Sequence, residues 1–398
     1  MGQTIATEGD PSRNHPATAL GAFSPTTAAA YGPLTPLCLR SLADSYDDRR
    51  HLFSHQLLDG AWTEVDATYP HETLTSSCIA LIGLARFGAL ADHPTVSAQR
   101  CLDAVRGEVR RTGYQAGIGL ALWANAVSDG AAPAAEYLGG IGLDFDDLVE
   151  RLLPSFTTME VAWLASGLLH EAARSDEPDV RDTARLVVDE LRTHRYSGAT
   201  RLMRHAGPGA SPVHRARGHI ANFADQIYSV QAFAFASLVL GDAAALGAGT
   251  ALASHHCDLQ GELGQWWWHF DARRGHVALR YAVYSVHQHG MAPMALAAIH
   301  RAGGLDVSAH VDASVGWLDH NELGSSLVDA SRSTIWRSVE RVEASLAGRL
   351  RGGLEALGVP DARAARVSLN RETRPYEWAW CLYAAAIAAG TPRGRSLV

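Results

Sequence analysis

Two stretches of the sequence, Gln56-Leu-Leu-Asp-Gly60-Ala-Trp62 and Gln260-Gly-Glu-Leu-Gly264-Gln-Trp266, share one spacing: Gln, three residues, Gly, one residue, Trp. Glycine permits a tight turn, and a glutamine amide can bond backbone groups that a helix end leaves unpaired. Tryptophan offers a large apolar surface that can pack between two helices. A polar loop and then a long apolar segment follow each stretch. The repeat therefore predicts a turn that ties neighbouring helix pairs together.

The apolar segments of the chain have the composition of helices. They are rich in Ala and Leu, contain few alternating β-branched runs, and are separated by Gly, Pro and Asp. Six of them are apolar nearly all round, which in a globular protein requires burial on every side. We therefore predict six inner helices, at residues 72–87, 114–127, 158–173, 225–240, 284–299 and 377–389.

The segments between them are amphipathic and predict outer helices, for example at residues 180–195 and 333–350. Alternation of fully buried and half-exposed helices is what a double ring of helix hairpins produces. We therefore predict an all-α fold, a single (α/α)6-type toroid over residues 36–398. Residues 1–35 are rich in Pro, Ala, Thr and Gly without a helical period, and we expect a loosely ordered N-terminal arm there.

Composition excludes several classes of function. A net charge of -8 argues against a protein that binds nucleic acid, because such proteins carry a basic face. The chain contains no lysine, which excludes Walker-type and Schiff-base lysine chemistry. No uninterrupted apolar run has the length of a membrane span, and the N-terminus lacks the features of a signal peptide. We expect a cytoplasmic protein with no integral membrane segment.

The paired QxxxGxW stretches resemble the terpenoid cyclase and protein prenyltransferase superfamily. Its squalene-hopene cyclase branch carries such repeats as structural ties in helical barrels, and the segment from Gln260 to Ile299 has the same order of turn, loop and inner helix. The resemblance covers the architecture from about residue 45 onward. It implies an α/α toroid with a central cavity, and the activity that it implies is terpene cyclisation.

In such a toroid the N-termini of the inner helices and the loops before them line the central cavity, so the polar and aromatic residues there are candidates. Asp225 is the strongest catalytic candidate, because a buried helix offers little solvent to a carboxylate. An N-terminal helix cap is the structural alternative for each acid, and packing in the core is the alternative for each ring. The remaining candidates are His287 for catalysis and, for substrate binding, Glu72, Glu160, Tyr228, Trp266, Trp267, Tyr281, Tyr284 and Gln288.

The acidic segment Asp144-Phe-Asp146-Asp147-Leu-Val-Glu150 fits two motifs of terpene cyclases. As DxDD it resembles the class II motif, whose middle aspartate, here Asp146, protonates an alkene while Asp144 and Asp147 flank it. As DDxxE it resembles a class I magnesium motif, in which case Mg²⁺ would be the cofactor; the second class I motif is missing. A capped outer helix is the structural alternative. Otherwise we expect neither a cofactor nor a protein-bound metal.

Together these observations lead us to expect a small terpene cyclase of class II type, which cyclises an isoprenoid inside the toroid by protonation. The main alternative is a carbohydrate-active enzyme on an (α/α)6 barrel, of the glycoside hydrolase, lyase or epimerase type, because the polar run Tyr284-Ser-Val-His287-Gln-His289 suits a sugar. A third alternative is a non-catalytic binding toroid. The polarity of the cavity wall distinguishes the first two: a wall of aromatic and aliphatic side chains with one or two acids favours an isoprenoid, and a wall with many hydrogen-bonding groups favours a sugar.

Overall fold

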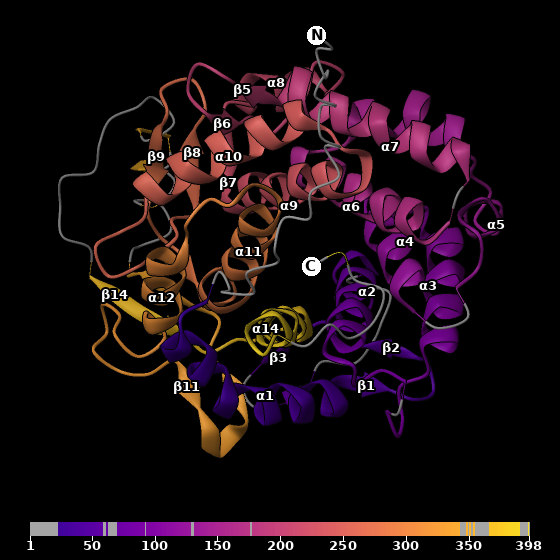
Figure 1. Ribbon diagram of the computed structural model, residues 1–398. Helices are drawn as coiled ribbons and strands as arrows, with labels where there is room; N and C mark the ends of the chain where they lie inside the picture. The colour runs from indigo at the N-terminus through magenta and orange to yellow at the C-terminus, as the bar shows by residue number, and fades with distance from the viewer. Residues whose placement is uncertain are drawn as a thin grey trace, which may run out of the picture.

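Two concentric rings of helices form the described part of the chain, which in this computed structural model comprises residues 23–58, 61–62, 70–91, 93–128, 131–175, 177–342, 348, 350–351, 353–354, 366–390 and 397 (Figure 1). The inner ring consists of α2 (Pro70–Phe87), α4 (Ile118–Val127), α6 (Thr158–Arg174), α9 (Phe223–Leu240), α11 (Ala292–Gly303) and α14 (Pro375–Ala388). The outer ring consists of α1 (Pro25–Ser45), α3 (Ala98–Thr112), α5 (Ala134–Gly139), α7 (Pro178–Glu190), α10 (Ala243–Asp258) and α12 (Ser308–Gly316).

The inner helices pack in chain order, and the ring closes where α14 packs against α2. Each outer helix leads into the inner helix that follows it, so the unit is a helix hairpin repeated around the ring. This arrangement confirms the predicted (α/α)6-type toroid. Of the predicted N-terminal arm, residues 1–22 lie outside the described residues, whereas α1 already begins at Pro25 rather than at the expected Pro36.

Short antiparallel strands and single helical turns connect the rings. The strands are β1 (Tyr46–Asp47), β2 (Leu52–Phe53), β3 (Leu57–Leu58), β4 (Ala61–Trp62), β5 (Tyr196–Ser197), β6 (Leu202–Met203), β7 (Ile220–Asn222), β8 (His269–Asp271), β9 (His276–Leu279), β10 (Val283–Tyr284), β11 (Val328–Asp329), β12 (Thr334–Ile335), β13 (Ser338–Arg341) and β14 (Val367–Asn370). The short helical elements are η1 (Asp147–Leu152), η2 (Leu153–Ser155), η3 (Leu191–Arg195), α8 (Pro212–Arg217), η4 (His287–Met291) and η5 (Ala330–Arg332).

The prediction of an outer helix at residues 333–350 is wrong for the first part of that range, which forms β12 and β13 instead. Strand β13 lies between β10 and β14, with Val339 opposite Val283 on one side and opposite Leu369 on the other. Val339 is fully buried there. Pairing with strands distant in sequence therefore overrides the local helical pattern. Residues 343–347 lie outside the described residues.

The second QxxxGxW stretch forms the predicted tie. The Gln260 amide donates hydrogen bonds to the carbonyl oxygens of Gly264 and His310, both at 3.0 Å, and its Oε1 lies 2.8 Å from Nδ1 of His310. Gly264 has a φ of +94°, and a Cβ there would overlap the Ala313 carbonyl of α12. Trp266 is buried, and its indole N–H donates to the Ser314 hydroxyl at 2.7 Å. In the first stretch Gly60 lies outside the described residues.

The centre of the toroid is filled at one end. A cluster of stacked and edge-on rings occupies it: Trp123, His170, Phe235, Trp380 and Tyr383. All five are buried, so the inner ring has a closed floor rather than a pore. Among the described residues, α9 alone is long and apolar enough to cross a membrane, and 78% of that window is buried inside the protein, as expected of a core helix.

Closure of the ring depends on Gly83 in α2, where a Cβ would overlap the backbone carbonyl of Ala379 in α14. We predict that Gly83→Ala lowers the free energy of unfolding by about 1 to 3 kcal/mol, the usual cost of overpacking. The matched control is Gly107→Ala in the middle of α3, where nothing lies within 4 Å of the added carbon and helix propensity gives up to about 1 kcal/mol of stabilisation. The midpoint of urea unfolding is measured for both variants. If Gly83→Ala unfolds at the same urea concentration as Gly107→Ala, the contact between α2 and α14 is not tight.

Candidate active site

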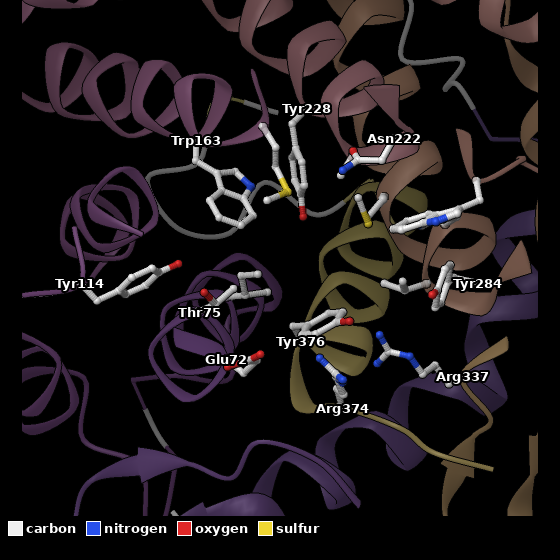
Figure 2. Close-up of a pocket in the computed structure, with 17 residues that line it drawn as sticks. Glu72, Thr75, Tyr114, Trp163, Asn222, Tyr228, Tyr284, Arg337, Arg374 and Tyr376 are labelled. Carbon is white, nitrogen blue, oxygen red and sulfur yellow. The ribbon is translucent and has the colours of Figure 1, made fainter. Parts of the chain in front are cut away.

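A cavity of about 340 Å³ opens at the N-terminal ends of the inner helices (Figure 2). Helices α2, α6, α9 and α14 and the turn η4 all contribute side chains from their first turns. This is the placement expected from the toroid. The lining residues are Glu72, Thr75, Ile79, Tyr114, Met159, Trp163, Asn222, Ala224, Tyr228, Trp268, Tyr284, Val286, His287, Met291, Arg337, Arg374 and Tyr376.

The cavity wall is rich in hydrogen-bonding groups. Five of the 17 lining side chains are apolar, and the others carry a hydroxyl, amide, carboxylate, imidazole, indole or guanidinium group. Figure 2 shows Glu72, Tyr376, Arg374 and Arg337 along one side of the cavity and Trp163, Tyr228 and Asn222 along the other. Most of the exposed lining is nevertheless apolar ring and aliphatic surface, so apolar faces and hydrogen-bonding groups occur together in this wall. A sugar has the same combination, because its ring has apolar C–H faces and a polar rim of hydroxyls.

His287 lies in the aromatic part of this wall. Its ring stacks on Phe223 at 4.1 Å between centroids and lies parallel to Trp268 at 5.8 Å. Its Nδ1 atom is buried and has no hydrogen-bond partner among the described residues. Burial, and then the positive charge of Arg337, hold the pKa of His287 well below its ordinary value. The imidazole is therefore neutral at physiological pH.

Two arginines of the cavity wall form ion pairs with carboxylates that do not line the cavity. Arg337 Nη1 lies 3.2 Å from Glu372 and 3.4 Å from the fully buried Glu377, and Arg374 Nε lies 2.6 Å from the same Glu372 oxygen. The Arg337 guanidinium also lies 5.1 Å from the centroid of the Tyr284 ring. These contacts use only part of each guanidinium, whose five N–H donors leave others to face the cavity.

Glu72 is the one carboxylate among the residues that line the cavity. It lies in the first turn of α2, where the helix dipole favours a negative charge. Its side chain in Figure 2 lies beside Tyr376, from the first turn of α14, and Arg374, the N-cap residue of that helix. The cavity thus combines one acid, two cations and one neutral imidazole.

Four of the residues predicted from the sequence meet in this cavity: Glu72, Tyr228, Tyr284 and His287. Asp225 does not line it. Its buried carboxylate accepts hydrogen bonds from the backbone N–H groups of Met159 and Asn222, both at 3.0 Å, and lies 2.8 Å from Nδ1 of His205. With Asn222 it forms the capping box of α9. Asp225 therefore contacts the cavity wall from behind.

The other predicted binding residues lie around the cavity rather than in its lining. Glu160 closes the capping box of α6 with Thr157. The Tyr281 hydroxyl donates to Glu322 at 3.0 Å, and the Tyr281 ring packs edge-on against Trp267. The Gln288 side-chain oxygen accepts from the backbone N–H of Trp266 at 3.3 Å.

The acidic segment is also separate from the cavity lining. The backbone N–H of Asp147 donates to the Asp144 carboxylate at 2.8 Å, and that of Asp144 donates to the Asp147 carboxylate at 3.3 Å. Asp144 and Asp146 are exposed. This reciprocal pattern is that of a helix cap at the start of η1. No group of three or more His, Cys, Asp or Glu side chains in the described residues is placed to hold a metal ion.

Sequence reasoning missed three lining residues that carry chemistry, Trp163, Arg337 and Arg374. Trp163 lies within a predicted inner helix, and nothing in the sequence distinguished it from a ring packed in the core. Arg337 was not considered as a site residue, because residues 333–350 were predicted to form an outer helix. Arg374 precedes Pro375-Tyr376-Glu377, a helix-start signal that pointed to this end of the cavity.

No protein-family model matches the chain, and no curated protein matches its sequence. Solved structures do match over nearly the whole chain. A sugar epimerase from a ruminal bacterium superposes with a TM-score of 0.59 at 12% identity, covering 92% of this chain and 99% of that one. An unsaturated glucuronyl hydrolase from Bacillus sp. GL1 gives 0.59 at 14% identity, covering 92% and 97%. The cellobiose 2-epimerase of Spirochaeta thermophila gives 0.55 at 14% identity, covering 92% and 97%.

These similarities confirm the (α/α)6 fold and correct the family expected from the sequence. These three structures are enzymes of carbohydrates and not terpene cyclases, so the assignment to the terpenoid cyclase superfamily is wrong. The predictions that depended on this assignment, namely a class II cyclase, protonation of the substrate by Asp146 and an isoprenoid substrate, are therefore wrong as well. The physical reason is that QxxxGxW, as Gln260 and Trp266 show, joins α12 to the preceding turn and says nothing about the chemistry of the cavity.

Proposed function

We propose that the protein is a carbohydrate-active enzyme that moves a proton on a reducing sugar, as an isomerase or epimerase does. The observation that supports this proposal most directly is the position of His287. Its neutral imidazole lies in the wall of a cavity in which most lining side chains carry a hydrogen-bonding group. A neutral imidazole is a general base that can remove the acidic C–H proton next to a carbonyl group. The full-length similarity to a sugar epimerase and to a cellobiose 2-epimerase supports the same class.

The lining argues against glycoside hydrolysis by a pair of carboxylates. That mechanism needs two Asp or Glu residues on either side of the scissile bond, about 5 to 10 Å apart. Glu72 is the one carboxylate in the lining, and Asp225 and Glu160 are engaged in capping boxes behind it. Proton transfer by His287 requires no second carboxylate and no cofactor.

Arg337 completes the chemistry, because removal of a proton next to a carbonyl leaves negative charge on the oxygen. A guanidinium beside the base stabilises that charge as an oxyanion hole does. Its own position is secured by Glu372 and Glu377, so it needs little reorganisation when the charge develops. Trp268 and Tyr284 offer ring faces for stacking of the sugar.

A uronate lyase is the second candidate, and the arginine pair is the observation that favours it. Arg337 and Arg374 can neutralise the carboxylate of a uronic acid, which makes the neighbouring C–H proton acidic enough for His287 to remove. The two candidates share a base and differ in product: a rearranged sugar or a conjugated unsaturated uronate.

The experiment that tests the proposal is incubation of the enzyme with reducing monosaccharides and disaccharides in D₂O, followed by NMR. We expect exchange of the proton on the carbon next to the carbonyl, together with a new sugar. The ultraviolet absorbance of a conjugated double bond, measured with polyuronates, detects the lyase. Absence of exchange, of a new sugar and of elimination across the whole panel, with a correctly folded protein, would refute the proposal.

We predict that His287→Gln lowers kcat by about 10² to 10⁴, the usual contribution of a general base. The matched control is His170→Gln. His170 is likewise buried and stacked on a tryptophan, and burial lowers its pKa to about 3, but it lies in the floor cluster and not in the cavity lining. The measurement is the initial rate of the exchange reaction, with thermal melts for both variants. A similar rate loss in both variants would mean that His287 acts through packing.

We further predict that Arg337→Lys lowers kcat by about 10² while the melting temperature changes little. Lysine keeps the charge that pairs with Glu377 but loses the planar fork that meets the developing oxyanion. Arg332→Lys, at an exposed arginine outside the cavity that pairs with Asp329, is the control and should react like wild type. An unchanged rate for Arg337→Lys contradicts the role assigned to Arg337.

A further inference from the structure

Asn222 stands where the cavity wall meets the start of helix α9. It is the last residue of β7 and the N-cap of α9, and it lines the cavity. Its side-chain oxygen accepts a hydrogen bond from the backbone N–H of Asp225 at 2.8 Å. The Asp225 carboxylate in turn accepts from the backbone N–H of Asn222 at 3.0 Å, so the two residues hold each other in a capping box.

The capping box decides which atom of the Asn222 amide faces the cavity. A backbone N–H can only donate, so the side-chain atom that meets the Asp225 N–H must be the oxygen Oδ1. The nitrogen Nδ2 therefore faces away from the helix, and Figure 2 shows the amide directed into the cavity. Among the described residues, Nδ2 donates no hydrogen bond. Two N–H donors of fixed orientation are thus free to bind a ligand.

Neighbouring contacts hold this part of the wall in place. Asp225 is fully buried, and its carboxylate also accepts from the backbone N–H of Met159, a lining residue of α6, and lies 2.8 Å from Nδ1 of His205. On the other side, Asn222 pairs with His269 in β8. A donor that is already held in position binds a ligand with little further loss of conformational freedom.

Asn222 adjoins the proposed base along the wall. The next residue, Phe223, stacks on the imidazole of His287 with 4.1 Å between the ring centroids, and its N–H donates to the Trp268 carbonyl at 2.9 Å. In Figure 2, Arg337 lies on the opposite side of the cavity from Asn222. The two side chains therefore approach a ligand from different sides. When Arg337 holds the carbonyl oxygen of a sugar, Asn222 meets another of its oxygens.

We propose that Asn222 is a specificity-determining residue, whose amide N–H groups donate to one hydroxyl oxygen of the sugar. The inference rests on the proposed function and names a feature of its substrate: an oxygen, and not an ammonium group, stands at the position that faces Asn222. Asp225, for which the sequence predicted a catalytic role, is then a positioning residue. It fixes the Asn222 amide and lies outside the cavity lining.

The selectivity follows from the chemistry of a group that can only donate. An amide N–H pairs with the lone pairs of a hydroxyl oxygen, whereas it finds no acceptor in a C–H group and meets another donor in a protonated amine. A donor that loses its water without gaining a partner costs affinity. The requirement applies to this position alone, because Glu72, on the opposite side of the cavity, can accept from an ammonium group.

Asn222→Ser separates recognition of the sugar from capping of the helix. Serine caps a helix about as well as asparagine, through its hydroxyl oxygen, but it lacks the two amide donors. The probe is the sugar that wild type binds most tightly by calorimetric titration, among the reducing monosaccharides and disaccharides of the exchange experiment. We expect Kd and KM for this sugar to rise about tenfold, kcat to stay within about threefold, and the melting temperature to stay close to that of wild type.

Asp242→Ser is the matched control, because it makes a similar change of cap on the outer ring. Asp242 is the N-cap of α10, accepts from the backbone N–H of Ala245 at 2.9 Å, and lies outside the cavity lining. Its Kd and KM for the same sugar should equal those of wild type.

A thermodynamic cycle with sugar analogues tests whether the contact is direct. Analogues that carry a hydrogen or an amino group in place of one hydroxyl are titrated into wild type and Asn222→Ser. At one position, wild type should bind the deoxy and amino analogues at least about tenfold more weakly than the parent sugar. In Asn222→Ser, the parent sugar and that deoxy analogue should bind equally, which is the sign of direct coupling.

Asp225→Asn tests the positioning role in the same cycle. It should lose the preference for the parent sugar over that deoxy analogue, and adding Asn222→Ser to it should change Kd no further, because both changes act through one amide. A merely structural role would weaken the binding of both sugars by the same factor and leave the preference intact.

The outcomes separate this inference from the proposed function. If wild type binds sugars but exchanges no proton on any of them, the proposed function fails, and the Kd values still decide the role of Asn222. If Asn222→Ser keeps the Kd of wild type, or binds the parent sugar and every analogue more weakly by one factor, the role of Asn222 is overturned. An Asp225→Asn variant that retains the preference overturns the role of Asp225. A wild-type protein that binds no sugar refutes both proposals.

Discussion

The tight contact between the first and last inner helices is the constraint on which the rest of the structure depends. Helix α2 meets α14 at Gly83, where the backbone of Ala379 occupies the space of a side chain, and this contact closes the ring. Closure places Glu72 from α2 next to Arg374 and Tyr376 from α14, although some 300 residues of chain separate them. The cavity exists because the helices converge, and its polar groups come from their N-terminal ends.

The same geometry lowers the pKa of His287. The inner helices seal the floor with aromatic rings, so His287 is surrounded by Phe223 and Trp268 and remains neutral. Behind the wall, the buried Asp225 carboxylate accepts from the backbone N–H groups of Met159 and Asn222, and its hydrogen bond with His205 raises the pKa of that imidazole.

The sequence predicted the ring but only part of its cavity. Helices without a polar face can only be central, and five of the six inner helices lie within four residues of their predicted ranges. The exception is α11, predicted at residues 284–299, which begins at Ala292 because β10 and η4 precede it. The cavity end was also predictable, since Glu72, Tyr228, Tyr284 and His287 stand at helix starts. Arg337 was not predictable, because it directly precedes β13. That strand forms by pairing with β10, about 55 residues earlier, and with β14, about 30 residues later. The partnership of Asp225 with His205 depends on the same kind of long-range placement, and the family was misjudged because a packing motif was taken as a sign of chemistry.

A crystal structure of the protein soaked with a reducing sugar tests the central claim most directly, since it asks whether this cavity is where a saccharide is held. The account predicts a sugar stacked on Trp268 or Tyr284, with its carbonyl oxygen within hydrogen-bond distance of Arg337 and a neighbouring C–H directed at the His287 imidazole. A sugar bound only on the outer surface of the toroid, or a cavity without sugar at a concentration that saturates the reaction, would contradict it.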